Sequence, residues 1–357
     1  MSRPLAHRSG GLLVLQPAFL GDVVLSTALM ESWHRQFPED PVRVLVRKGA
    51  EGFFEGHPFV SEVLVWDRRD WKKYARLLTM ARTVRTGAAD YVVNLHRFSS
   101  MAWVSRWSGA PRRTAFQGAP GSRGGRVEVF AHGLGDGHHE IERNHRHIQG
   151  AVGEFDLAQE MPKLHPQAEH MAAASAWPSG AVVLAPGSVW ATKRWPPHQW
   201  TALANAVSAR WPNVPVILIG GKGDADRLES IAKGCSSPPS VCAGELSLLE
   251  TAALMASAKV AVSNDSAPLH MAGAVRCPVV GVFCSTTPSF GFGALPLAMS
   301  EGWGCNVELP SKSEELECKP CGVHGLRQCP RGHFRCGENL TVEAVLKGMV
   351  GVSSLPS

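Results

Sequence analysis

The stretch LLVLQPAFLGDVVLSTALMESW, residues 12–33, has the pattern of a strand, a turn and a helix in succession. A short apolar run is followed by a turn that contains Gly21, and then by apolar residues at helical spacing over 23–33. The same unit recurs in the first half of the chain. Further strands are predicted at 42–46, 63–66 and 91–95, and helices at 71–85 and 144–157. Alternating strands and helices predict a parallel sheet covered on both faces.

A second set of such units begins with AVVLAPGSVWATKRWPPHQW, residues 181–200. Further strands are predicted at 216–220, 259–262 and 279–283, and helices at 198–211, 224–233, 248–258, 267–275 and 341–350. The stretch 117–137 is rich in Gly, Arg and His and is interpreted as a loop, and 162–180 as a linker. We therefore expect an α/β protein with two doubly wound domains, residues 1–170 and 171–340. Residues 341–357 would form a last helix that can cross back to the first domain.

Size and composition agree with two globular domains. The chain has 357 residues, of which 44% are hydrophobic and 19% charged. A formal net charge of +5 is too small to predict nucleic-acid binding, but it suits anionic substrates or an anionic membrane surface. No signal peptide or membrane-spanning run is evident, and nine cysteines, an odd number, favour a reducing compartment. We expect a cytoplasmic protein.

Asp22 ends the turn between the first predicted strand and helix. In an open α/β sheet, ligands gather outside the carboxyl ends of the strands, so this carboxylate is a candidate general base for an acceptor hydroxyl. The alternative is a cap for the helix that follows. The glycine pattern of a dinucleotide-binding dehydrogenase is absent from the turn.

The loop 185–196 follows the first strand of the second half directly. Its Gly-Ser turn leaves backbone N–H groups available, Ser188 and Thr192 have hydroxyls, and Lys193 with Arg194 adds positive charge. This combination predicts an anion-binding loop, although a solvated basic pair is the simpler alternative.

The motif Ser263-Asn-Asp-Ser-Ala-Pro-Leu-His270 closes one strand and opens a helix with proline near its first turn. The N–H groups and positive dipole end of such a helix suit a diphosphate. Asp265 can bind a sugar hydroxyl or cap the helix, and Ser266 and Ala267 offer backbone N–H groups.

Four cysteines near the end of the chain, at Cys318, Cys321, Cys329 and Cys336, form the pattern C-x2-C-x7-C-x6-C. A two-residue gap allows both thiolates to face one ion, so this pattern predicts a structural zinc site. A reduced thiol cluster that packs a short Gly-rich segment is the alternative. Neither interpretation places the segment beside the predicted binding loops.

Two weaker signals concern the substrates. Arg97 and Arg113 belong to a group of arginines that can meet an anionic acceptor, although charge-rich faces are more often only solvated. Asp226 follows the Gly220-Gly221 turn and can bind a ribose, and capping the next helix is the simpler explanation.

Taken together, these segments resemble glycosyltransferase family 9, the ADP-heptose:lipopolysaccharide heptosyltransferases, and in particular the branch that adds the second heptose. The resemblance is carried by the Leu20-Gly-Asp22 turn, by Pro186-Gly-Ser188 through Lys193-Arg-Trp-Pro196, by Asn264-Asp-Ser266 and by the cysteine-bearing segment. One departure is that Ala267 and Pro268 stand where the family often has glycine after the Asp-Ser pair.

The resemblance implies a GT-B fold, with two Rossmann-like domains that face a central cleft, and an inverting transfer of heptose from ADP-heptose to the lipopolysaccharide inner core. It implies Asp22 as the catalytic base, Ser188 and Lys193 as ligands of the donor phosphates, and Asp265 with the backbone of Ser266 and Ala267 around the sugar and diphosphate. No cofactor is required, and the enzyme would touch the inner membrane peripherally. The alternatives are another nucleotide sugar and a binding protein without activity.

Overall fold

A computed structural model describes residues 10–67, 73–122, 127–149, 159–295, 304–311 and 316–356. The chain forms two compact units, the first made of residues up to 133 together with 140–165, and the second of 134–139 together with 166–357. The boundary at 165/166 lies close to the predicted one at 170/171. Inside the predicted linker, residues Ala168–Ala174 form a short helix, α5, that belongs to the second unit.

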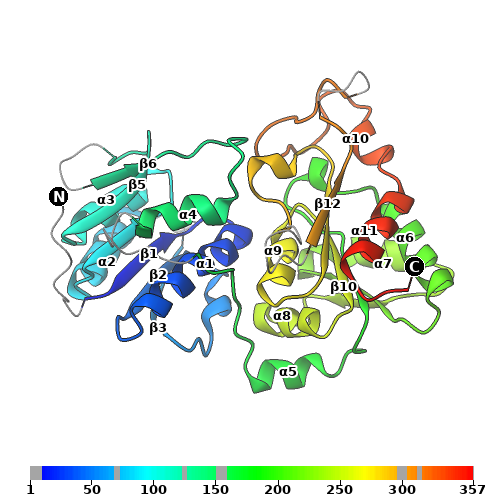
Figure 1. Ribbon diagram of the computed structural model, residues 1–357, viewed down its shortest axis with the longest axis horizontal. Coiled ribbons are helices and arrows are strands. Elements are labelled where there is room, and N and C mark those ends of the chain that lie inside the picture. The colour runs from blue at the N-terminus through cyan, green and yellow to red at the C-terminus, as the bar shows by residue number, and fades with distance from the viewer. Residues whose placement is uncertain are drawn as a thin grey trace. The chain divides into compact units, whose positions relative to one another are not determined.

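The first unit is built on a six-stranded parallel sheet with the order β3-β2-β1-β4-β5-β6 (Figure 1). The strands are β1 (Leu12–Gln16), β2 (Val42–Arg47), β3 (Val60–Trp66), β4 (Tyr91–Asn94), β5 (Arg112–Phe116) and β6 (Val127–Phe130). All five residues of β1 are buried because both faces of the central strand are covered. The loop predicted at 117–137 was wrong in part, since the edge strand β6 lies within it; four residues among glycines and arginines give too short a pattern to detect.

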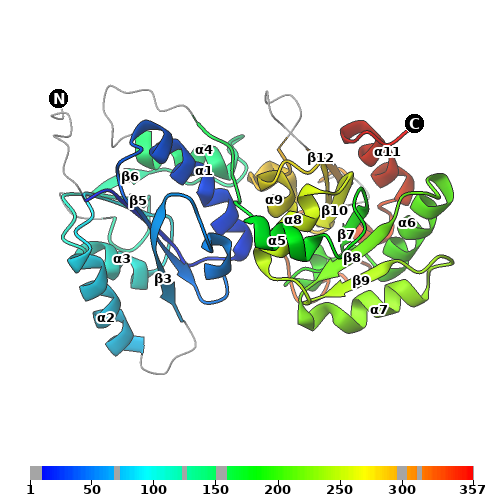
Figure 2. The same cartoon turned by 90° about the horizontal axis from the view of Figure 1, so that it is seen from below.

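Helices cover both faces of this sheet. The helices α1 and α4 pack together, as do α2 and α3, and the two pairs lie on opposite sides of the strands in Figure 2. Their bounds are α1 (Leu20–Gln36), η1 (Glu51–Phe54), α2 (Lys73–Thr86), α3 (Ser99–Trp107) and α4 (Glu140–Gln149). The helix predicted at 144–157 therefore begins four residues earlier, and its second half, 150–157, lies outside the described residues.

The second unit repeats the design, with the strand order β12-β11-β10-β7-β8-β9 and parallel pairing throughout. The strands are β7 (Val182–Ala185), β8 (Val216–Gly220), β9 (Ser240–Ala243), β10 (Val260–Asn264), β11 (Val279–Phe283) and β12 (Gly304–Glu308). The expectation of an α/β fold with two doubly wound sheets is confirmed. The edge strands β9 and β12 were not predicted, because neither has a clear apolar run in the sequence.

The helices of the second unit also form two layers. One layer contains α6, α7 and α11, and the other contains α5, α8 and α9. Their bounds are η2 (Ala191–Lys193), α6 (Pro197–Arg210), η3 (Lys222–Asp224), α7 (Ala225–Lys233), α8 (Leu248–Ala256), α9 (Ala267–Ala274), η4 (Pro288–Phe290), α10 (Arg335–Glu338) and α11 (Val342–Val352). Helix α8 begins with the predicted capping box, in which Ser247 Oγ accepts from Glu250 N at 3.3 Å.

The last helix, α11, packs on β11, β12 and α6 of its own unit, beside which it lies in Figure 1. Val345, Leu346 and Met349 are its buried residues, and all three join the core of the second unit. The prediction that residues 341–357 cross back to the first domain is therefore corrected. The apolar positions 345, 346 and 349 form one helix face, and the sequence does not say which sheet this face covers.

None of the helices in the described part of the chain combines the length and apolar character that a membrane span requires.

Candidate active site

The strand order of the second unit defines where a ligand can bind. The first strand of this unit, β7, lies between β10 and β8, so the connections that leave β7 and β10 run to opposite sides of the sheet. Such a switch point opens a crevice outside the carboxyl ends of the strands. Three polar segments follow strands there: the 186–196 loop after β7, Asp265-Ser266 after β10, and Ser285-Thr286 after β11.

Lys193 and Asp265 form an ion pair at this edge. Lys193 Nζ lies 2.6 Å from Asp265 Oδ2, and the two side chains are only 14% and 9% exposed. Thr286 Oγ1 donates to the same carboxylate oxygen at 2.6 Å. Among the described residues Asp265 Oδ1 has no hydrogen-bond partner. The predicted Lys and Asp are therefore brought together, and one carboxylate oxygen can still accept from a ligand.

Asn264 fixes both ends of the 186–196 loop. It is fully buried at the end of β10, its Nδ2 donates to Pro186 O at 2.7 Å, and its Oδ1 accepts from Trp195 N at 3.0 Å. Because Pro186 begins the loop and Trp195 stands near its end, one amide side chain sets the shape of the whole loop. Buried polar groups with both bonds satisfied make such a link rigid.

Thr192 is held by residues distant in the sequence, and its predicted contact with the donor stays a prediction. Its side chain is buried, and its Oγ1 accepts from Ser285 Oγ at 2.9 Å and from Leu326 N at 2.8 Å. Thr192 N in turn donates to Leu326 O at 3.1 Å. These bonds tie the loop to the segment that carries the four cysteines.

That segment, residues 316–340, packs directly on the 186–196 loop. A Cβ at Gly325, whose φ is +76°, would lie 3.0 Å from Lys193 Cγ and 3.1 Å from Trp190 Cβ. A side chain at this position would be strained, because of both the close contact and the left-handed backbone. The sequence had not placed the cysteine segment beside a binding loop, and the structure does.

Helix α9 begins at the same edge. Ser266 is its N-cap residue, and Pro268, which has no N–H group, stands in its first turn. Leu269 N donates to Ser266 O at 3.1 Å, which leaves the N–H group of Ala267 available at this end of the helix. His270 follows one turn later and is 8% exposed. Burial lowers the pKa of His270 to about 4, with Asp265 opposing the shift and His139 and Lys193 reinforcing it. The imidazole is therefore neutral at pH 7 and leaves Lys193 as the cation here.

Asp224 and Arg194 complete the other side of the loop. Arg194 Nε donates to Ser188 O at 2.7 Å, and Asp224 pairs with Arg227 while a Cβ at Gly187 would come within 3.0 Å of its Oδ2. Ser188 is half-buried and Arg194 holds its carbonyl in place. Asp226 lies exposed in the first turn of α7, whose N-cap residue is Asp224, so the cap role considered for Asp226 is wrong and its contact with a ribose stays a prediction.

In the first unit, Asp22 lies in the first turn of α1, after the carboxyl end of the central strand β1. Phe19, not Asp22, is the N-cap residue, and Asp22 Oδ2 accepts from Phe19 N at 3.2 Å. The carboxylate thus stands at the third helical position, and its side chain is half-buried. This placement agrees with the predicted strand-end position and explains how the side chain is held.

The two predicted acceptor arginines lie at different ends of the sheet. Arg97 follows β4 and is exposed, with its Nη1 3.4 Å from His132 Nδ1. Arg113 is the second residue of β5, so its backbone lies near the amino end of that strand and away from the turn of Asp22. Two aromatic rings, Phe19 (43% exposed) and Phe98 (67% exposed), follow the paired strands β1 and β4 instead.

The four cysteines form one electrostatic group. Burial raises the pKa of Cys336 to about 12, and the thiols of Cys321, Cys329 and Cys318 add to this shift. The thiol of Cys318 also lies 3.9 Å from His333 Nε2. However, no three of the sulfur atoms of these four described residues all lie within 4.8 Å of one another. The sulfur–sulfur distances are therefore wider than those around a zinc ion in a closed tetrahedral site. The cysteines are near one another without a formed metal geometry.

Sequence reasoning missed three polar residues that organise the site. Asn264 stands in a predicted motif that gives it no role of its own, and Ser285 and Thr286 come shortly after the apolar strand Val279–Phe283. Polar residues directly after a buried strand are the signal that could have identified them, because carboxyl ends of neighbouring strands share one edge.

Comparison with known proteins agrees with this geometry. The family model described as glycosyltransferase family 9 (heptosyltransferase) matches residues 77–320. The chain is 24% identical over 298 residues to lipopolysaccharide heptosyltransferase 1 of Pseudomonas aeruginosa, which covers 78% of this chain and 80% of that protein. It is 22% identical over 313 residues to lipopolysaccharide heptosyltransferase 2 of Escherichia coli, covering 78% and 84% of the two chains.

Solved structures share the fold. A glycosyltransferase of family 9 from Veillonella parvula superposes with a TM-score of 0.80 at 17% identity, over 98% of this chain and 99% of that one. ADP-heptose lipopolysaccharide heptosyltransferase II of Escherichia coli superposes with a TM-score of 0.74 at 18% identity, over 96% and 98%. The strand orders, the loops at the switch point and the family match over two thirds of the chain lead to one conclusion: this chain belongs to glycosyltransferase family 9.

Proposed function

We propose that this enzyme transfers a heptose from ADP-heptose to the inner core of lipopolysaccharide with inversion at the anomeric carbon. The observation that carries this proposal is the cluster of Lys193, Asp265 and Thr286 at the switch point of the second unit, beside the N-terminus of α9. Family membership adds the reaction class, and the heptosyltransferases among the relatives supply the donor and acceptor.

The donor diphosphate would bind between the 186–196 loop and the start of α9. Lys193 supplies a positive charge, Ser188 a hydroxyl, and the N–H groups at Ser266 and Ala267 the positive end of the helix dipole. Ala267 in place of glycine still leaves its N–H available. Asp265 Oδ1 would accept from a sugar hydroxyl, while Oδ2 keeps Lys193 in position. Thr192 would position the loop, and Asp226 would contact the ribose.

Asp22 would act as the general base. The acceptor hydroxyl attacks the anomeric carbon, its proton passes to the carboxylate of Asp22, and the bond from that carbon to the diphosphate oxygen breaks. Negative charge then builds on the departing ADP, where Lys193 and the α9 dipole stabilise it. These groups supply the charge stabilisation, so the step needs no metal ion.

The acceptor would be recognised by the first unit. Arg97 offers charge to an anionic inner-core sugar, and the exposed rings of Phe19 and Phe98 offer flat apolar surfaces of the kind on which sugars stack. Arg113 would contribute through its long side chain. The net charge of +5 supports peripheral contact with the inner face of the membrane, where the acceptor is made, and hence a cytoplasmic site of action.

A transfer assay tests the proposal. The purified chain is given ADP-heptose and a heptose-deficient lipopolysaccharide acceptor, and ADP release and the product mass are measured. We expect one heptose to be added per acceptor and little ADP release without acceptor. Transfer from another nucleotide sugar at a higher kcat/KM would contradict the donor assignment, and tight ADP binding without turnover would favour a binding protein.

We also propose that Cys318, Cys321, Cys329 and Cys336 hold a structural zinc ion. The support is their spacing in the sequence and the position of Cys318 Sγ, 3.9 Å from His333 Nε2. An ion would have to draw the sulfur atoms closer than they lie now. Zinc would stabilise the 316–340 segment and, through Leu326, the 186–196 loop. Metal analysis of the purified protein should show that Cys321→Ser lowers the zinc content by one ion per chain; an equal metal content in this variant would refute the site.

A further inference from the structure

Helix α1 holds the segment that leads to the second unit. Lys163 N donates to Thr27 Oγ1 at 3.0 Å, and Glu160 N donates to Ser32 Oγ at 2.9 Å. Thr27 and Ser32 are five residues apart, so the segment 159–165 lies against more than one side of this helix. Three more polar side chains meet where the segment ends.

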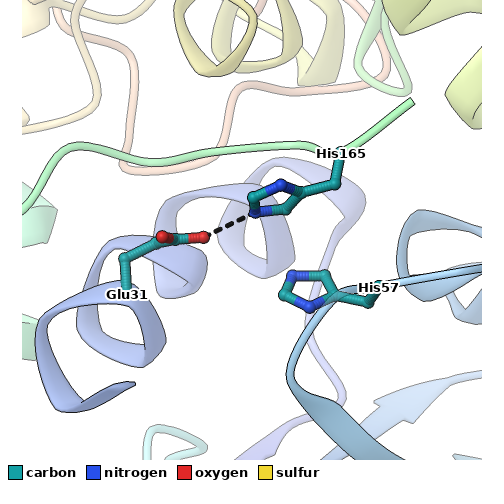
Figure 3. Close-up of side chains that lie close together, drawn as sticks. All are labelled: Glu31, His57 and His165. Carbon is teal, nitrogen blue, oxygen red and sulfur yellow. Dashed lines mark hydrogen bonds and ion pairs between the residues drawn. The ribbon is translucent and has the colours of Figure 1, made fainter. Parts of the chain in front are cut away.

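These side chains are Glu31, His57 and His165, drawn in Figure 3. Glu31 lies in α1, His57 lies in the turn before β3, and His165 is the last residue of the first unit. Figure 3 shows both imidazoles turned toward the carboxylate. His165 Nε2 lies 2.7 Å from Glu31 Oε1, and one ligand atom from each residue lies within 4.8 Å of the others. Three elements distant in sequence thus present three donor atoms to one point.

We propose that Glu31, His57 and His165 form a binding site for a divalent transition-metal ion of the zinc class. Two imidazole nitrogens and one carboxylate oxygen are a ligand set that such ions accept, with a fourth position left for water. Magnesium and calcium, which prefer oxygen ligands, would bind weakly here. The site is separate from the proposed catalytic group, because Asp22 and Glu31 are about 13 Å apart along α1 at 1.5 Å per residue.

The local charges favour a cation. Glu31 has a side chain that is only 9% exposed and is the acid of the group. Burial lowers the pKa of His57 to about 4, with His165 and His34 adding to the shift and Glu31 opposing it. A neutral imidazole has the free lone pair that metal binding requires. The competing cation is Lys163, whose Nζ lies 3.6 Å from Glu31 Oε2 and whose side chain is 39% exposed, so it can turn to solvent.

One contact limits the affinity. His57 Nδ1 accepts from Val60 N at 3.3 Å and from Phe59 N at 3.5 Å, which favours a proton on Nε2, the nitrogen nearer to Glu31. Metal binding at Nε2 moves that proton to Nδ1 and gives up both contacts. Since these two hydrogen bonds are long, their loss costs little free energy.

A bound ion would fix the start of the connection between the units. His165 is followed directly by Pro166, the first residue of the second unit after the boundary. The ion would join this point to α1 and to the turn before β3, in addition to the hydrogen bonds along 159–165. The site is therefore structural or regulatory, and it does not depend on the identity of the sugar donor.

Cobalt(II) titration of the full-length protein at neutral pH tests the site. Nitrogen and oxygen ligands give visible d–d absorption, whereas cysteine ligands add strong sulfur-to-metal charge-transfer absorption, so the thiol segment can be told apart. We expect Glu31→Gln, His57→Gln and His165→Gln each to weaken the nitrogen–oxygen signal about ten-fold or more. His34→Gln is the matched control, since this ring stacks on Phe59 at 4.0 Å beside His57 without supplying a ligand.

Two outcomes would overturn the proposal: the three variants bind cobalt as the wild type does, or the signal that they lose contains sulfur charge transfer. Where a variant fails to fold, the wild-type protein decides alone. Zinc should raise its Tm and protect His57 and His165 from carbethoxylation by diethyl pyrocarbonate, while His34 is modified at an unchanged rate. Equal modification of all three histidines with and without zinc would refute the site.

Discussion

In each sheet, the strand beside the central strand ends in a buried asparagine, and the two asparagines differ in the hydrogen bonds that they make. Asn94 ends β4, the neighbour of β1, and Asn264 ends β10, the neighbour of β7; both are buried. Among the described residues, Asn94 Oδ1 accepts from His96 N, two residues later, whereas Asn264 bridges Pro186 and Trp195 of the neighbouring loop. At these matching positions, the asparagine of the first unit supports its own loop, and that of the second links to the loop of a neighbouring strand.

This difference fits the two substrates proposed. A diphosphate is small and strongly charged, and it is best stabilised by groups that are already in place before the reaction. Asn264, Thr286 and the Lys193–Asp265 pair provide such a fixed arrangement. An oligosaccharide is large and variable, and exposed side chains such as Arg97 and Phe98 can adjust to it.

The largest effect should come from the first unit. Asp22→Asn removes the proposed base while it preserves the size of the side chain, and we expect kcat to fall by about 10²- to 10⁴-fold with little change in the KM for the donor. Steady-state transfer kinetics measure both constants. Glu39→Gln, an exposed change before β2, is the control and should leave kcat unchanged. If Asp22→Asn turns over as fast as the wild type, Asp22 is not the general base.

Lys193→Ala is the corresponding test of the second unit. Loss of the cation that faces the leaving diphosphate should lower kcat/KM by about 10²- to 10³-fold and weaken ADP binding. Isothermal titration with ADP follows the binding component. Lys233→Ala, exposed at the end of α7, serves as the charge-matched control. If both lysine variants bind ADP equally well, the 186–196 loop does not hold the diphosphate.

The asparagine comparison can be tested on stability. Asn264→Ala leaves two backbone groups without their partner, so we expect the free energy of unfolding to drop by about 2–5 kcal/mol, against about 1 kcal/mol for Asn94→Ala. Urea unfolding followed by tryptophan fluorescence measures the difference. Similar losses in the two variants would show that the cross-strand bonds of Asn264 add no support beyond the local bond of Asn94.

The smallest effect, counted per pH unit, concerns the loss of stability in acid. Burial lowers the pKa of His147 in the first unit to about 3, with His132 adding to the shift, and His270 in the second unit has a pKa of about 4. The unfolded chain takes up these protons near pH 6.5, before the folded chain does, so stability is complete above that pH and is lost as the pH falls toward 4. Each histidine should contribute up to about 1.4 kcal/mol per pH unit in this window.

Urea unfolding at a series of pH values tests this slope. His270→Gln and His147→Gln should each reduce the acid sensitivity by one histidine's share, and His198→Gln, an exposed change in α6, should not. An acid sensitivity that is the same in all three variants would show that burial of these rings does not control it.

The sequence predicted the parts of the fold that depend on strong local patterns. Both central strands, β1 and β7, are fully buried apolar runs, and the helices that follow them have clear spacing. Edge strands such as β6 and β12 lack such runs because their faces are only partly covered. The sheet that α11 covers could not be predicted either, since an apolar helix face shows that the helix packs on something but not on which sheet.

For the candidate site, the sequence indicated single motifs and missed the contacts that join them. Lys193 and Asp265 stood in separate motifs whose proximity follows from the strand order, which the sequence does not reveal. Thr192 was assigned to the ligand because its hydroxyl stands beside the basic pair, but its partners are Ser285 and Leu326, more than 90 residues away. Long-range packing of this kind leaves no local pattern.

The contact between Gly325 and Lys193 has a consequence for biosynthesis. The ribosome makes residues 186–196 long before 316–340, so the nascent chain carries an unfinished phosphate-binding loop until its last stretch emerges. Messages that break off upstream of that stretch would yield polypeptides with both sheets largely present and the loop unsupported. Catalytic competence should therefore appear abruptly at the end of translation.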